Sequence, residues 1–151
     1  MRLTHDDRII LATFVLVFSA FTTIYITQPV LPAVERHFNT SSFYSSLSVS
    51  IVLAGITLGS IPSGFLSEKY SILPLAALAS VLIIICDIGC ALTINLGTLI
   101  SLRFCQGLFI PFLTSAMAAS LTRSVADQNI VRGIAWYVTA TILGGMTGRL
   151  M

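Results

Sequence analysis

The chain has 151 residues, of which 56% are hydrophobic and 9% are charged. Because charged residues make up about a quarter of soluble domains, this composition excludes an ordinary soluble protein and places the chain in a lipid bilayer. The formal net charge of +2 gives no support to nucleic-acid binding. The cysteines, Cys86, Cys90 and Cys105, lie within apolar sequence and lack further ligands at metal-binding spacing, so they indicate packing residues and no metal site.

Apolar runs of helix length recur along the whole sequence. A helix that crosses a bilayer needs about 20 predominantly apolar residues, so the pattern predicts an all-α fold, a polytopic membrane helical bundle without a soluble domain. The first run is longer than the apolar core of a signal peptide and lacks a cleavage site after it, so we expect it to remain as the first span. About five transmembrane helices are expected, at residues 9–34, 43–66, 72–95, 98–121 and 130–150.

The far end of the first span carries two prolines in the run Tyr-Ile-Thr-Gln-Pro-Val-Leu-Pro, from Tyr25 to Pro32. Proline removes backbone hydrogen bonds and kinks a helix, which a membrane tolerates where neighbouring groups or water satisfy the freed carbonyl groups. We therefore expect this helix to bend beside a cavity.

Small residues are regularly spaced in two spans. Gly55, Gly59 and Ser63 recur at every fourth position of the second span, and the last span ends in a glycine-rich run. Ridges of small residues let another helix backbone approach closely. We therefore assign these glycines to helix packing; they are Gly55, Gly59, Gly144, Gly145 and Gly148.

Two charged residues, Asp87 and Arg103, lie well inside apolar spans. A charge in a spanning helix costs at least ~2.5 kcal/mol near the bilayer centre, so it usually faces a protein interior or a water-filled path. At helical spacing Arg103 shares its face with Gln106, Gly107 and Thr114. Asp87 has two interpretations, a proton carrier or a residue near the outer water interface.

The basic residues of the short connections indicate the orientation of the chain. The positive-inside rule places the side with more lysine and arginine in the cytoplasm. Arg36 is alone on one side, so we expect a cytoplasmic N-terminus in a multi-pass protein of the cell (inner) membrane. The residues on the opposite side are Arg2, Arg8, Lys69, Arg123 and Arg132.

The sequence Arg-Phe-Cys-Gln-Gly, from Arg103 to Gly107, resembles the fourth-helix Arg-x-x-Gln-Gly signature of the major facilitator superfamily. The run from Tyr25 to Pro32 is similar to the Tyr-x-x-Gln-Pro-x-Leu-Pro element of a bacterial branch of drug or sugar efflux proteins related to arabinose-efflux-like permeases. Residues 64–70 stand where the family places a gating loop, and residues 144–150 resemble its glycine-rich antiporter motif. The likeness covers essentially the whole chain.

The loop motif also departs from the family pattern. The motif is matched at Gly64, Leu66, Glu68 and Lys69. Its second glycine is replaced by Ser71, and the two basic positions after that glycine are replaced by Ile72 and Leu73. In the family this loop is thought to hold helix ends through charge pairs. Gly64, Glu68 and Lys69 are therefore the candidate gating residues, with fewer partners than usual. The helix-five motif has Gly145 where proline is usual and Arg149 where a second glycine is usual.

The resemblance implies two six-helix halves around a central path, whereas this chain supplies about five helices. We therefore expect it to be an N-terminal part that lacks the sixth helix and the C-terminal transporter half. A truncated gene, a frameshifted remnant and a partial sequence are all compatible with this expectation. Such a fragment is expected to be inactive alone.

In the intact protein the resemblance implies efflux of a small solute by alternating access, driven by protons and without a cofactor. Arg103 would then bias the protonation of a nearby carboxylate. Gln106 would form a hydrogen bond with the substrate or a neighbouring helix, and Gly107 would permit close packing. Tyr25 and Gln28 would line the cavity. Purely structural roles stay open: for Arg103, pairing with a carbonyl group or Asp87, and for Tyr25 and Gln28, interfacial anchoring and helix capping.

The sequence bears on two other classes of protein. A self-sufficient homo-oligomeric transporter or channel stays open, because the glycine ridges of two spans also suit contacts between subunits. An enzyme is disfavoured, because the histidines, His5 and His37, lie in polar flanks and no catalytic motif occurs.

Overall fold

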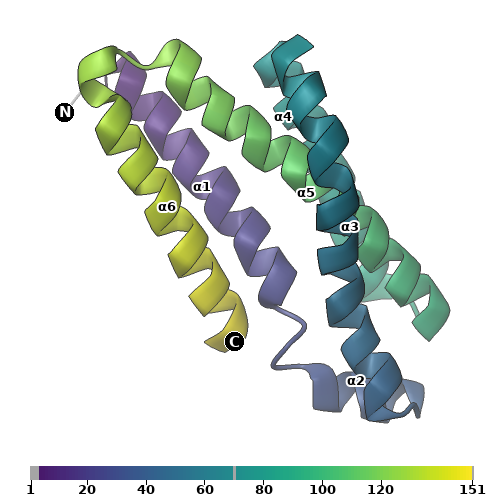
Figure 1. Ribbon diagram of the computed structural model, residues 1–151. Coiled ribbons are helices and arrows are strands. Elements are labelled where there is room, and N and C mark those ends of the chain that lie inside the picture. Colours follow the sequence, from purple (N-terminus) through teal and green to yellow (C-terminus); the bar gives the residue numbers. More distant parts are fainter. Residues whose placement is uncertain (1–3, 70, 151) are drawn as a thin grey trace.

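The computed structural model describes residues 4–69 and 71–150, without the side chains of residues 67–69 and 72. The described part of the chain contains six helices and no strands, so the predicted all-α fold is confirmed (Figure 1). Consecutive long helices alternate in direction, so the link between α5 and α6 returns to the start of α1. The helices are α1 His5–Tyr25, α2 Leu31–Phe38, α3 Ser42–Lys69, α4 Ile72–Leu92, α5 Leu96–Ser124 and α6 Asp127–Leu150.

Two groups of helices form the bundle. Both α3 and α4 pack along α5, and α6 packs along α1. The core between the groups includes Val17, Val52 and Ala116, none of which is exposed. Within the described residues, four helices (α1, α3, α4 and α5) are long and apolar enough to cross a membrane. Helix α6 is long enough, with 24 residues, but Arg132 and its glycine and threonine residues make it less apolar.

The expected first span, residues 9–34, is divided in the structure. Helix α1 ends at Tyr25, and a hydrogen-bonded turn, in which the Gln28 amide donates to the Tyr25 carbonyl oxygen at 2.9 Å, separates it from α2. Pro32 lies in the first turn of α2, where a missing amide hydrogen is tolerated. The prolines thus produce a break and a new short helix, where the sequence predicted only a bend.

Polar helix ends extend beyond the apolar runs. Helix α5 continues to Ser124 and α6 starts at Asp127, so most of the polar segment between the last two expected spans is helical. Helix α3 likewise continues through the expected turn to Lys69. Apolar content marks the part of a helix that can lie in lipid, but backbone hydrogen bonding continues into the water-exposed ends.

Glycines set the distance between α3 and α5. A Cβ atom added at Gly55 would lie 2.5 Å from the Phe104 carbonyl oxygen, and Gly107 faces the Val52 backbone from the opposite side. Gly59 faces the Leu108 backbone in the same way. Backbone contact of this closeness leaves no room for any side chain at these positions.

Glycines also set the distance between α6 and α1. A Cβ atom at Gly144 or Gly148 would lie 2.5 Å from the carbonyl oxygen of Phe18 or Thr22, respectively. The Thr22 hydroxyl donates to the Gly144 carbonyl oxygen at 3.2 Å. Gly145 lies beside the Tyr25 ring, where an added Cβ would make an ordinary contact at 3.4 Å.

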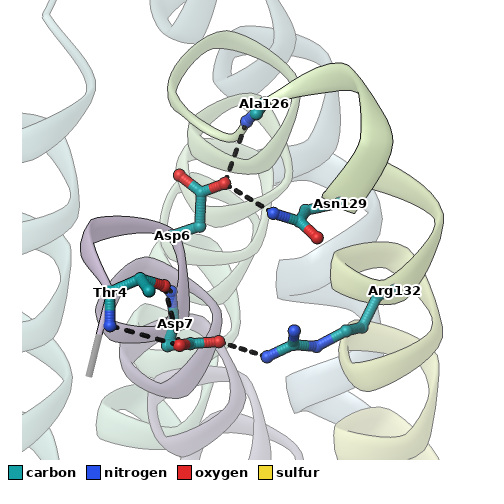
Figure 2. Close-up of polar contacts among 6 residues, drawn as sticks. All are labelled: Thr4, Asp6, Asp7, Ala126, Asn129 and Arg132. Carbon is teal, nitrogen blue, oxygen red and sulfur yellow. Dashed lines mark hydrogen bonds and ion pairs between the residues drawn. The ribbon is translucent and has the colours of Figure 1, made fainter. Parts of the chain in front are cut away.

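Polar contacts connect the start of α1 with the start of α6, at the other end of the α1–α6 pair (Figure 2). The Asp6 carboxylate accepts hydrogen bonds from the Ala126 amide at 3.3 Å and the Asn129 side chain at 2.8 Å. Asp7 pairs with Arg132 and forms a capping box with Thr4 at the start of α1. The start of α1 is therefore tied directly to the link between α5 and α6.

We expect Gly55→Ala to destabilise the bundle by about 1–3 kcal/mol, because the new methyl group must push α5 away from α3. Gly64→Ala is the matched control on the same helix, since a Cβ there meets nothing within 4 Å. Thermal unfolding in detergent measures both. Equal melting temperatures for the two variants would show that close α3–α5 contact is not required.

Candidate functional site

The buried guanidinium group of Arg103 is the centre of the candidate site. Arg103 lies on α5, and only 5% of its surface is exposed. Its Nη1 donates to the Thr23 carbonyl oxygen of α1 at 3.1 Å and to Gln106 Oε1 at 2.9 Å. The serine-threonine-rich end of α1 supplies this carbonyl, next to the break at Tyr25. Arg103 therefore connects α1 with α5 inside the bundle.

Gln106 extends this connection to α4. Its side chain is fully buried, and Nε2 donates to Asp87 Oδ1 at 2.5 Å. Among the described carboxyl groups none makes an ion pair with Arg103, so the amide of Gln106 links the two opposite charges. Asp87 itself is half-buried. We call these three residues, Asp87, Gln106 and Arg103, the buried polar chain. It joins α4 and α5 to the α1 backbone.

The buried polar chain can respond to protonation. An ionised carboxylate only accepts hydrogen bonds, whereas a protonated carboxyl group also donates one. A glutamine amide offers a donor group and an acceptor group, so its orientation depends on the partner. Gln106 contacts both charged groups, since its amide nitrogen donates to Asp87 and its amide oxygen accepts from Arg103. Such a linkage is unusual within apolar helices, where intramembrane charges commonly mark functional sites.

The other residues predicted with Arg103 lie elsewhere. Gly107 packs against the backbone of α3. Gln28 is half-buried in the turn after α1. Tyr25 is half-buried at the end of α1, where the Arg149 guanidinium lies 4.3 Å from the centre of its ring. The predicted set therefore does not form one site.

Tyr25 lines a separate pocket of about 310 Å³ between α1, α3 and α5. Its wall contains hydroxyl groups from both α3 and α5, with the Ser63 and Ser115 oxygens 3.3 Å apart. We call this the hydroxyl pocket. Its polar lining consists of Tyr25, Ser60, Ser63, Thr114 and Ser115.

Thr114, which is predicted to share a face of α5 with Arg103, lies about three helical turns further along, so the two residues line different pockets. The spacing of Gly55, Gly59 and Ser63 predicts only helix packing, and Ser60 stands beside this ridge in the sequence. Their position beside glycines on the second span was the one signal that pointed to this wall.

The candidate gating residues are at the end of α3. Gly64 lies within the helix, on an exposed part of its surface. Glu68 and Lys69 belong to its last turn, and their side chains lie outside the described residues. The glycines that would serve contacts between subunits in a homo-oligomer contact α5 and α1 of the same chain instead.

Comparisons with known proteins agree with this architecture. The sequence profile described as Major Facilitator Superfamily matches residues 13–151. The inner membrane transport protein YnfM of Escherichia coli is 26% identical over 144 residues, which are 95% of this chain and 34% of that protein. No solved structure matches the chain.

Two further relatives are named as transporters. The uncharacterized MFS-type transporter YybF of Bacillus subtilis is 24% identical over 95% of this chain and 36% of its own length. The efflux pump dotC of Dothistroma septosporum is 36% identical over 59% of this chain and 15% of its own length. The chain spans about a third of the length of the bacterial relatives. With a profile match over nearly its whole length, this chain belongs to the major facilitator superfamily.

Proposed function

We propose that this chain forms part of a transporter that moves a small solute out of the cell in exchange for protons, by alternating access. The observation that carries the proposal is the buried polar chain, because a carboxyl group linked to a buried guanidinium group can exchange a proton and pass on the change. The family match supports membrane transport, and the name of the dotC efflux pump supports outward movement.

Asp87 is the proposed proton carrier. When it is ionised, the Gln106 amide donates to it, as in the structure at 2.5 Å. When Asp87 takes up a proton, it gains a donor, and the best hydrogen bonding of Gln106 and Arg103 changes with it. Because Arg103 also holds the α1 backbone at Thr23, proton uptake alters the contact between α1 and α5.

The hydroxyl pocket is the proposed contact surface for the solute. Its aromatic and hydroxyl groups suit a small amphiphile or sugar, which needs apolar contact and a few hydrogen bonds. Transporters of this architecture bind the solute between two repeats near the membrane midplane. We infer that the chain provides one wall, with a second wall from the part of the transporter that corresponds to the remaining length of its relatives.

The orientation and the gate belong to the same proposal. The excess of basic residues near the start of α1 and near the α5–α6 link supports a cytoplasmic N-terminus in the inner membrane. Gly64, Glu68 and Lys69 would then lie at the cytoplasmic end of α3, where a gate can close the path. An independent homo-oligomer is less well supported, because the glycine ridges are used inside the chain.

We expect infrared spectra of the purified chain in lipid nanodiscs to show a protonated carboxyl band that disappears as the pH rises. Asp87→Asn should remove this band, because the amide carries no exchangeable carboxyl proton. Asp127→Asn, at an exposed position at the start of α6, should keep it. An unchanged titration in Asp87→Asn would exclude Asp87 as the proton carrier.

The link through Gln106 has its own test in the same spectra. Arg103→Lys should shift the titration of the carboxyl band, because the bond from Nη1 to Gln106 is lost. In a Gln106→Leu background we expect the Arg103→Lys change to shift the titration much less, since the bridge is absent. Equal shifts in both backgrounds would show that Arg103 acts on Asp87 directly through space and that Gln106 is not a relay.

A further inference from the structure

A pocket of about 270 Å³ lies between the first turns of α1 and α6. It shares no lining residue with the hydroxyl pocket or with the buried polar chain. Two opposite charges, Asp7 and Arg132, belong to its lining, and the other lining residues are apolar or aromatic. We call it the α1–α6 pocket. Its apolar lining consists of Ile10, Leu11, Phe14 and Trp136.

Both charged groups can be reached from outside the bundle. The Arg132 side chain is 54% exposed and that of Asp7 is 24% exposed. Arg132 uses one nitrogen, Nη2, to pair with Asp7 (Figure 2), and a guanidinium group has five N–H donors, so most of them stay available to an anion. Asp7 Oδ2 accepts from Thr4, and Oδ1 accepts from Arg132. Because each carboxylate oxygen has two acceptor sites, Oδ1 can accept a second hydrogen bond.

The apolar part of the pocket continues from the charged part toward the middle of the helices. Leu11 is 51% exposed and Trp136 is 47% exposed, and the Phe14 ring meets the Trp136 ring edge-on, with the ring centres 5.5 Å apart. Leu11 follows Asp7, and Trp136 follows Arg132, by about one helical turn. Tryptophan gathers at membrane–water interfaces. This order therefore places the charges at the level of the lipid headgroups and the apolar surface in the hydrocarbon.

A ligand of this pocket needs an anionic group for Arg132, an N–H donor for Asp7 and an apolar part. A phospholipid with a primary ammonium group has all three. Its phosphate and ammonium groups can lie beside the Asp7–Arg132 pair with charges that alternate in sign, so the pair need not break. A headgroup with a net negative charge would be attracted by Arg132 but repelled by Asp7.

We propose that the α1–α6 pocket binds one molecule of such a zwitterionic phospholipid. Its phosphate lies on Arg132, its ammonium group donates to Asp7, and the first part of an acyl chain packs on Leu11 and Trp136. Charged pockets between transmembrane helices are suited to lipid headgroups. The proposal is independent of the proposed function, since this binding requires neither transport nor proton exchange.

Trp136 is the only tryptophan of the chain, so its fluorescence reports on this pocket. Bromine atoms on an acyl chain quench tryptophan fluorescence at short range. In phosphatidylcholine nanodiscs, a minor share of the lipid is replaced by a brominated lipid, and the rise of quenching with this share gives a relative affinity. We expect an affinity about 10-fold higher for phosphatidylethanolamine than for phosphatidylcholine, because the choline group has no N–H to donate to Asp7. Phosphatidylglycerol should bind less well than phosphatidylethanolamine.

Two variants assign the contacts, each with a matched control at an exposed position of the same end of the bundle. Asp7→Asn should abolish the preference for phosphatidylethanolamine over phosphatidylcholine, and Asp127→Asn should keep it. Arg132→Gln should lower the preference for phosphatidylcholine over diacylglycerol, which lacks a phosphate, and Arg123→Gln should not. Each preference compares two lipids on the same variant, so a loss of stability does not imitate the expected change.

The unaltered chain alone can overturn the proposal, whether or not the variants fold. It is overturned if phosphatidylethanolamine and phosphatidylcholine bind equally, or if phosphatidylglycerol binds better than phosphatidylethanolamine. Displacement of brominated phosphatidylethanolamine by phosphoethanolamine in the buffer would also overturn it, because a soluble headgroup would then suffice. Among the variants, an unchanged preference in Asp7→Asn or in Arg132→Gln would contradict the assigned contact.

Discussion

The fold depends on the placement of one guanidinium group away from lipid. Arg103 lies in an apolar helix, where an unpaired charge would be costly. The bundle meets this constraint by surrounding it with a carbonyl oxygen from α1 and an amide from its own helix, and that amide reaches a carboxyl group on α4. The charge therefore fixes the relative position of three helices as well as the chemistry of the site.

Close backbone contact allows these polar groups to meet. Glycines at the α3–α5 and α1–α6 interfaces let the helices pack without intervening side chains. Packing of this kind is needed in a membrane, because lipid gives little hydrophobic drive for helices to associate. The bundle thereby has a polar network around Arg103 and the hydroxyl pocket further along α5, near Thr114. Proton exchange and solute contact are proposed for separate surfaces that share this helix.

Several features were predictable from local sequence and others were not. The all-α membrane fold followed from the apolar runs, and the burial of Arg103 followed from the cost of a charge in lipid. The split between α1 and α2 was missed, because two prolines can either bend or end a helix. The bond between Gln106 and Asp87 joins residues 19 positions apart on different helices, so helical periodicity could not reveal it.

Solid-state NMR in lipid bilayers tests the central claim most directly. With labelled nitrogen in the Gln106 and Arg103 side chains and labelled carbon in the Asp87 carboxyl group and the Thr23 carbonyl group, close Gln106–Asp87 and Arg103–Thr23 transfers are expected. These signals would place the guanidinium group inside the bundle, linked to the carboxyl group through the amide. Transfer from Arg103 to lipid phosphate, with none to Thr23, would show that the side chain reaches the membrane surface and would contradict the account.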